Sequence, residues 1–193
     1  MSELRLIAPP PRRELLARLR PRLGQLVPGG LVIAEGILGA DAPIDFVTID
    51  PVGRVVLVLV GAHGEDLELI GQGLAQRAWV EARRGDWLQL APQLELRADS
   101  PVQAMLLCPA FGTASRSAIE ALGRDVIAAG QYRCVQSAAG FEVLVEHVDF
   151  DRPEDPAGDP PPARRAPPAA AEFRSGLSDA DLGITADERL EFE

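Results

Sequence analysis

The sequence predicts an α/β protein with a mixed central β-sheet flanked by helices, followed by a disordered C-terminal tail. Apolar, β-branched runs such as residues 54–60 alternate along the chain with segments of helical periodicity. The first three predicted strands are separated only by short turns, which is typical of an antiparallel meander. Strands alternate with helices after that meander, and this order favours a mixed sheet with helices on its faces.

Three segments have the apolar spacing of amphipathic helices. The first, residues 12–26, carries leucines three and four positions apart and should be kinked by Pro21. The second, residues 65–84, begins with acids and finishes with arginines, and we expect Gly85 to stop it. The third, residues 115–130, closes with a glycine.

Strands are predicted where apolar and β-branched residues run together between turn residues. The segment Pro51–Gly53 should form a tight hairpin connection. The strand after it is apolar on both faces, as expected of a buried central strand. The predicted strands span residues 31–38, 44–50, 54–60, 102–111, 131–137 and 141–150.

Composition divides the chain at residue 150. Residues 1–150 should form one α/β domain that begins with the N-terminal helix, because 193 residues with 47% hydrophobic content can bury one good core. Residues 151–171 hold seven prolines and should be a disordered linker. Residues 172–193 form an acidic segment with scattered apolar residues. This pattern suits either a short protein-binding peptide or a frayed, solubilising tail. The candidate partner-binding residues are Phe173, Leu177, Leu182, Ile184, Leu190 and Phe192.

Charge and composition exclude several function classes. All nineteen basic residues are arginine, so no mechanism that needs a lysine nucleophile, acid or base is available. The net charge of −10 disfavours a broad nucleic-acid-binding face, although DNA binding stays possible. Five arginines near the N-terminus could contact DNA or could form the solvated face of a helix; they are Arg12, Arg13, Arg18, Arg20 and Arg22.

The sequence also predicts a cytoplasmic protein that does not enter the membrane. No apolar run approaches the ~20 residues needed to span a bilayer, and the first thirteen residues lack the apolar region of a secretory signal. Cys108 and Cys134 each lie in an apolar stretch, and we expect both to be buried, reduced thiols. The pattern indicates no particular oligomeric state.

A motif within residues 44–72 carries a family resemblance. Asp45 opens one strand, Asp50 and Gly53 shape a hairpin, and Gln72 falls on the following helix. In the order helix, three strands, helix, strand, these residues resemble the PD-(D/E)XK restriction-endonuclease-like superfamily, especially its bacterial members. The resemblance covers residues 12–150 and implies a restriction-endonuclease-like core.

The resemblance implies a metal-dependent site that this sequence keeps only in part. In the family, an aspartate and a glutamate hold Mg²⁺ through oxygen ligands, and a lysine two residues past the glutamate orients the attacking water. Asp45 matches the aspartate, but Leu59 falls at the glutamate position and Gly61 at the lysine position. Gln72 matches a family glutamine, whereas Gln76 replaces the aromatic residue four positions later.

We therefore expect a non-catalytic, nuclease-like binding or scaffold protein, without a cofactor, that meets a protein partner through its C-terminal arm. Asp45 would then be a turn or edge-strand acid. One alternative is a DNA nuclease dependent on Mg²⁺ or Mn²⁺, with a migrated site in which Glu35, Glu65 and Gln72 join Asp45. The other is a DNA-binding pseudonuclease that uses the arginine-rich N-terminal helix.

Overall fold

The computed structural model describes residues 5–90, 92–137 and 140–150. The predicted linker, residues 151–171, and the predicted binding peptide, residues 172–193, lie outside the described residues. Among the helices described, none combines the length and the apolar character that crossing a bilayer requires.

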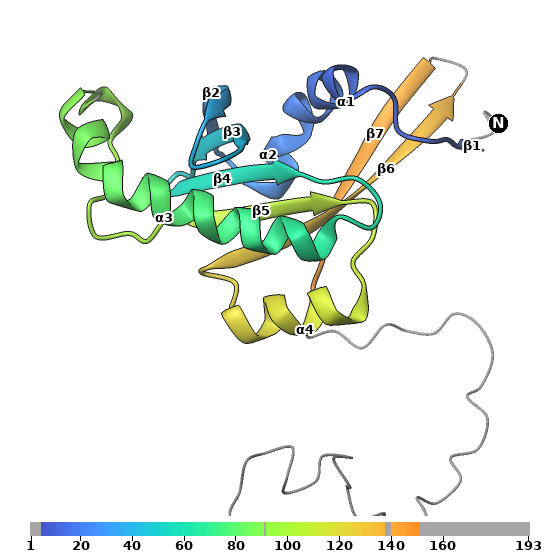
Figure 1. Cartoon of the computed structure of the whole chain (residues 1–193). Coiled ribbons are helices and arrows are strands. Elements are labelled where there is room, and N and C mark those ends of the chain that lie inside the picture. Colours follow the sequence, from blue (N-terminus) through green and yellow to red (C-terminus); the bar gives the residue numbers. More distant parts are fainter. Residues whose placement is uncertain (1–4, 91, 138–139, 151–193) are drawn as a thin grey trace, which may run out of the picture. The chain divides into compact units, whose positions relative to one another are not determined.

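A mixed sheet of seven strands forms the centre of the described domain and confirms the predicted fold class (Figure 1). Its strands are β1 (Arg5–Leu6), β2 (Leu31–Leu38), β3 (Pro43–Ile49), β4 (Val55–Val60), β5 (Gln103–Cys108), β6 (Ile127–Ser137) and β7 (Gly140–His147). The meander β2–β3–β4 is antiparallel, β5 and β6 then run parallel to β4, and β7 returns antiparallel to β6. The strand order is β1–β6–β5–β4–β3–β2, with β7 also paired to β6.

Helices cover both faces of this sheet (Figure 1). They are α1 (Arg12–Leu19), the 3-10 turn η1 (Arg20–Arg22), α2 (Leu23–Leu26), α3 (Asp66–Leu90), the 3-10 turn η2 (Pro92–Leu94) and α4 (Thr113–Leu122). The helices α3 and α4 connect the parallel strands and pack on one face, whereas α1 and α2 pack on the other. The order α1, β2–β3–β4, α3, β5 is the one that the family resemblance implies.

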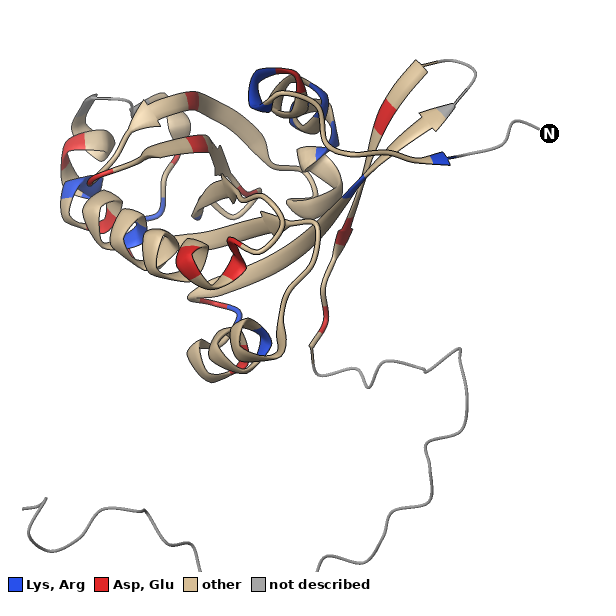
Figure 2. Ribbon diagram, turned by 45° about the vertical axis from the view of Figure 1, so that its right-hand side comes forward, with Lys and Arg blue, Asp and Glu red and all other residues tan. Residues whose placement is uncertain are grey.

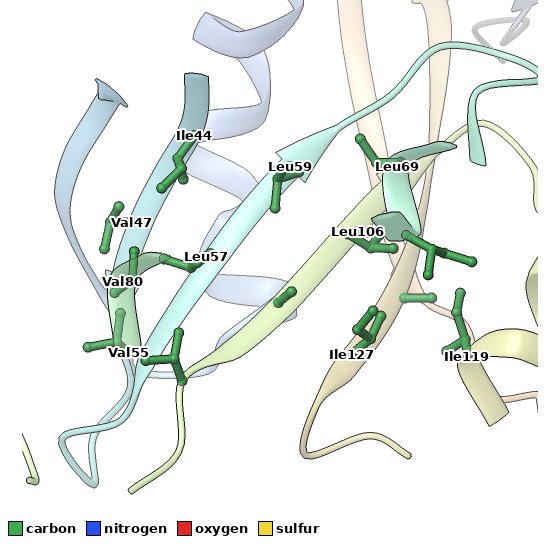
Figure 3. Packing of buried hydrophobic residues seen from close by; sticks show 14 of the residues in the cluster. Ile44, Val47, Val55, Leu57, Leu59, Leu69, Val80, Leu106, Ile119 and Ile127 are labelled. Carbon is green, nitrogen blue, oxygen red and sulfur yellow. The ribbon is translucent and has the colours of Figure 1, made fainter. Parts of the chain in front are cut away.

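The sheet separates two hydrophobic clusters, and β4 contributes to both. Leu57 and Leu59 pack beneath α3 together with Leu106 of β5 (Figure 3), whereas Val58 and Val60 pack beneath α1 and α2. A strand that is buried on both faces needs apolar residues at consecutive positions. The prediction that β4 is a central buried strand is confirmed.

The predicted break in the N-terminal helix is confirmed. The helix α1 ends at Leu19, a 3-10 turn contains Pro21, and α2 resumes at Leu23. Proline lacks the N–H that a continuous helix would use, so the chain changes direction there. Because of the break, leucines of both short helices reach the same cluster on the sheet.

The predicted hairpin between β3 and β4 is also confirmed. Asp50 Oδ1 accepts hydrogen bonds from the backbone N–H groups of Val52 at 3.0 Å and Arg54 at 2.9 Å. Gly53 has a φ of 84°, and a Cβ at this position would lie 2.6 Å from the carbonyl oxygen of Glu95. Only glycine fits this turn.

The predicted end of the long helix is wrong. Gly85 does not stop α3, which continues to Leu90. No atom lies near the position that a Gly85 side chain would take, so this glycine faces open space and costs the helix only about 1 kcal/mol relative to alanine. Trp87 and Leu88 beyond it pack against the core, and this tertiary contact outweighs the weak local signal.

The predicted helix over residues 115–130 is too long at its C-terminal end. The helix α4 ends at Leu122, where Gly123 has a φ of 80° and its N–H bonds to the carbonyl oxygen of Ile119 at 3.1 Å. Residues 127–130 instead begin β6 and pair in parallel with β5. Their apolar spacing suits either structure, and the neighbouring strand decides between them.

Smaller differences occur at three other strands. The strand β1 was not predicted, because the two residues Arg5 and Leu6 are too short to form a pattern; they pair with β6. The predicted strand over residues 102–111 is shorter, since β5 ends at Cys108. The predicted strand over residues 141–150 is also shorter, since β7 ends at His147. None of these differences changes the class of fold.

Candidate functional site

Asp45 lies on β3, between β2 and β4, and the residue is buried. The prediction that Asp45 is a turn or edge-strand acid is therefore wrong, because β3 is an inner strand of the sheet. Backbone pairing of β3 with β4 ends at Phe46 and Val58, before it reaches the end of β4. There the Asp45 Oδ2 atom accepts a hydrogen bond from the backbone N–H of Val60 at 2.8 Å. The carboxylate of Asp45 thus accepts the hydrogen bond that a backbone carbonyl of β3 would accept if the pairing with β4 continued to Val60.

Arg12, the first residue of α1, binds the same two strand ends. Its Nη2 atom lies 2.7 Å from Oδ1 and 2.8 Å from Oδ2 of Asp45, and its Nη1 atom donates to the carbonyl oxygen of Val60 at 2.9 Å. The side chain of Asp45 is 5% exposed and that of Arg12 is 53% exposed. One guanidinium therefore joins β3, β4 and α1.

Burial raises the pKa of Asp45 above its ordinary value of 3.8. The hydrogen bond from Val60 and the charge and hydrogen bonds of Arg12 act in the opposite direction, because they stabilise the carboxylate. Since the effect of burial is the larger, the charged form of Asp45 depends on these two partners.

The positions at which the resemblance places a glutamate and a lysine are occupied by the core. Leu59 is 1% exposed and packs beneath α3 (Figure 3). A Cβ on Gly61 would lie 2.9 Å from Cys108 Sγ and 3.1 Å from Leu69 Cδ2. The carbonyl oxygen of Gly61 also accepts a hydrogen bond from the hydroxyl of Tyr132 at 3.0 Å. A long charged side chain at either position would have to displace packed neighbours.

Both cysteines are buried free thiols, as predicted. Burial raises the pKa of Cys108 to about 12, and the nearby carboxylates of Asp66 and Glu65 act in the same direction. The pKa of Cys134 is raised by burial too. Since only the thiolate is a strong nucleophile, these residues act as small apolar side chains.

A cavity of about 240 Å³ lies between the start of α1 and the start of α3; Arg12 and Val60, the two partners of Asp45, line it, whereas Asp45 itself does not. Of the residues considered for a migrated site, Glu65 and Gln72 line this cavity. Glu35 does not line it, and its carboxylate is bound by Arg20. Two of the three candidates therefore share a cavity with the partners of Asp45, and the third lies elsewhere.

The two acids of this cavity already have hydrogen-bonding roles within α3 and its preceding loop. Glu65 Oε2 accepts from the backbone N–H of Ala62 at 2.7 Å, and Glu68 Oε1 accepts from Gln72 Nε2 at 3.3 Å. Figure 2 shows acidic residues at the start of α3 and basic residues on α1. The cavity wall formed by α3 is negative, which is unfavourable for a phosphate group.

While Arg12 is in place, the oxygen atoms around Asp45 are not available to a divalent metal ion. Both Asp45 oxygens and the carbonyl oxygen of Val60 are bound by Arg12. In the part of the chain that the structure describes, no group of three or more His, Cys, Asp and Glu side chains is placed to hold a metal. Mg²⁺ prefers several oxygen ligands in octahedral geometry, and the leucine and glycine at positions 59 and 61 provide no side-chain oxygen.

The arginine-rich N-terminal segment is largely engaged within the domain. Four of its five arginines contact an acid or an aromatic ring of the sheet: Arg12–Asp45, Arg20–Glu35, Arg22–Glu142 at 3.7 Å, and Arg18 over the Phe141 ring at 6.0 Å. Arg13 is exposed and, within the described residues, has no hydrogen bond or ion pair from its side chain. Three of the five guanidinium charges are thus paired with a carboxylate of the domain.

Sequence reasoning named Arg12 and Gln76 but missed the structural role of each. Arg12 is separated from Asp45 by 33 positions, and no local pattern links them. Gln76 is buried; its Nε2 donates to the carbonyl oxygen of Ala42 at 2.7 Å and its Oε1 accepts from the N–H of Ala40 at 2.9 Å. Gln76 thereby holds the β2–β3 loop against α3. Gln76 lies four positions before Val80, which is buried on the same helix, and this spacing is the signal that could have indicated its role.

No protein-family model and no curated protein sequence matches the chain. Remote likenesses exist among solved structures. A repair endonuclease from Pyrococcus abyssi has a TM-score of 0.45 and 13% identity, over 66% of this chain and 47% of that one. The EndoMS–dsDNA2 complex has a TM-score of 0.40 and 12% identity, over 60% of this chain and 41% of that one. SfsA of Pyrococcus furiosus in complex with Ca²⁺ has a TM-score of 0.37 and 12% identity, over 70% of this chain and 63% of that one. This chain thus spans less than two thirds of each of these structures.

Proposed function

We propose that this chain is a degenerate member of the PD-(D/E)XK superfamily, whose nuclease-like domain acts as a binding or scaffold component and does not cut nucleic acid. The order α1, β2–β3–β4, α3, β5 supports membership, together with the position of Asp45 on β3. The observation that carries the non-catalytic function is the tight packing at positions 59 and 61, which leaves no room for the catalytic glutamate and lysine of the family. Leu59 is part of the core, and a side chain on Gly61 would collide with Cys108 and Leu69.

The charge distribution favours a protein partner over DNA. The wall of the cavity beside Asp45 carries Glu65 and Glu68, and most N-terminal arginines already contact the sheet. We propose that the acidic C-terminal arm, residues 172–193, carries the partner contact through its apolar side chains. A partner surface with a basic rim would complement such a segment.

The first test measures metal binding and DNA cleavage on the same samples. Mn²⁺ is titrated by calorimetry into the wild type, Asp45→Asn and Glu65→Gln, and each protein is assayed for plasmid nicking. The proposal predicts no nicking by any of them and no Mn²⁺ binding that depends on Asp45. Nicking by the wild type that is lost in Asp45→Asn would overturn it.

The arm is tested in the full chain. We expect a partner captured by the wild type to be lost when residues 172–193 are removed, and also when the six apolar residues of that segment are replaced by serine. A matched control replaces the same six residues by methionine, which keeps their apolar character and the acidic charge of the segment. Equal capture by all variants would refute the role of the arm, and circular dichroism confirms that the domain stays folded.

One observation favours a second function, a metal-dependent DNA nuclease with a migrated site. Glu65 and Gln72 line the same cavity as Arg12 and Val60, beside Asp45. In this function, Arg12 would have to leave the carboxylate before a metal ion could bind. Nicking lost in both Asp45→Asn and Glu65→Gln is the result that would establish it.

A further inference from the structure

The contacts of Arg12 have the arrangement of a bound cation. Three oxygen atoms converge on its guanidinium: both carboxylate oxygens of Asp45, at 2.7 and 2.8 Å, and the carbonyl oxygen of Val60, at 2.9 Å. They come from two different strands, β3 and β4. Carboxylate and carbonyl oxygens are hard ligands, which would suit a divalent ion as well as a guanidinium.

Asp45 needs a positive partner in this position. Its side chain is 5% exposed, and a buried carboxylate without a partner is strongly destabilising. The N–H of Val60 donates one hydrogen bond to Oδ2, which satisfies part of the carboxylate but does not neutralise its charge. Among the described residues, Arg12 is the one side chain that forms an ion pair with Asp45.

The position of Arg12 allows its side chain to be replaced without loss of the helix. Arg12 is the first residue of α1 and is about half exposed, whereas Leu15 and Leu19 anchor the helix in the core. A change at position 12 therefore removes the cation and leaves the packing of α1 in place. Arg12, Val60 and Glu65 line the neighbouring cavity.

We infer that Arg12 acts as a permanent, built-in cation. Its guanidinium occupies the position that a divalent ion would take between the Asp45 carboxylate and the Val60 carbonyl oxygen, and it excludes such an ion. The guanidinium neutralises Asp45 and ties α1 to the ends of β3 and β4. A divalent ion and Arg12 compete for the same three oxygens, so without Arg12 the domain loses stability in metal-free solution and regains part of it when an ion binds. This inference concerns the same Asp45 site as the proposed function, but its test measures Mn²⁺ affinity and melting temperature and not DNA cleavage.

The test asks whether a metal ion can replace the missing arginine. Mn²⁺ affinity and the melting temperature are measured for the full-length wild type, Arg12→Met, Arg13→Met as the matched control, and Arg12→Met combined with Asp45→Asn. We expect Arg12→Met to bind Mn²⁺ at least tenfold more tightly than the wild type. At an ion concentration about ten times its Kd, Mn²⁺ should raise the melting temperature of Arg12→Met by roughly 4 °C.

Arg13→Met should behave like the wild type, and the double variant should lose the gain. The inference is overturned if Mn²⁺ stabilises the wild type as much as Arg12→Met, or if Arg12→Met gains no affinity. It is also overturned if the double variant keeps the gain. If Arg12→Met does not fold, Arg12→Gln provides the same comparison. Nicking by the wild type would instead refute the proposed function, so the two failures are distinct.

Discussion

Two ion pairs join the N-terminal helical segment to the β-meander, and they differ in burial. In the pair Arg12–Asp45 the acid is 5% exposed, whereas in Arg20–Glu35 the two side chains are 56% and 46% exposed. An exposed pair typically contributes 0–1 kcal/mol, because water screens both charges and the side chains lose conformational freedom. A buried carboxylate, in contrast, destabilises the fold when its partner is removed. The same chemistry is a minor surface contact at one site and a structural requirement at the other.

The largest loss of stability is expected for a buried carboxylate that has no arginine partner. Leu59→Glu places a carboxylate in the cluster beneath α3, and we expect it to lower the free energy of unfolding by more than about 4 kcal/mol. Urea denaturation at neutral pH measures the effect. The control Leu59→Met keeps the volume and should cost less than about 1.5 kcal/mol. An equally stable Leu59→Glu protein would show that this position is open to a catalytic acid.

The two ion pairs should respond differently to the loss of their arginine. Arg12→Met should lower the free energy of unfolding by about 2 kcal/mol, because Asp45 then remains buried without a cation. Arg20→Met should lower it by less than about 0.5 kcal/mol. Urea denaturation of both variants in metal-free buffer checks the difference. Equal losses would mean that burial does not set the importance of these pairs.

Acidification should distinguish the buried Asp45 from Asp66 at the start of α3. The pKa of Asp45 is raised by burial, so its contribution to stability is full below 3.8 and is lost as the pH rises through its folded value. The pKa of Asp66 is lowered, chiefly by the hydrogen bond from Ser115, so its contribution is present above 3.8 and is lost as the pH falls.

Unfolding free energies of the wild type, Asp45→Asn and Asp66→Asn at pH 7, 5 and 4 test this difference. From pH 7 to pH 4, the wild type should gain stability relative to Asp45→Asn and lose it relative to Asp66→Asn. We expect both changes to be smaller than the loss in Arg12→Met. Changes of the same sign in the two variants would contradict the opposite pKa shifts.

Salt should give the smallest difference between the two ion pairs. A double-mutant cycle for Arg20 and Glu35 should give a coupling energy of about 0.3 kcal/mol that disappears in 1 M NaCl, because the screening length falls to ~3 Å. The cycle for Arg12 and Asp45 should keep most of its coupling, since the carboxylate is shielded from the solvent. Equal salt sensitivity of the two cycles would contradict this.

Sequence patterns predicted the fold best where local and tertiary preferences agree. The break at Pro21 and the turn at Gly53 follow from backbone geometry, and β4 follows from a continuous apolar run. Predictions failed where a tertiary contact outweighed a local signal, as at Gly85 within α3 and at the start of β6. In both cases the residues after the predicted boundary pack against the core or pair with a neighbouring strand.

The sequence by itself determined the order of the main helices and of strands β2 to β7, the position of Asp45 in a strand, and the absence of a glutamate at position 59 and of a lysine at position 61. Only the tertiary structure decided that Asp45 is buried and that Arg12 neutralises it. Periodicity and turn signals act over a few residues, so they can be read from the chain. The electrostatic partner of a buried charge is selected by packing between distant segments, and it becomes visible only when those segments meet.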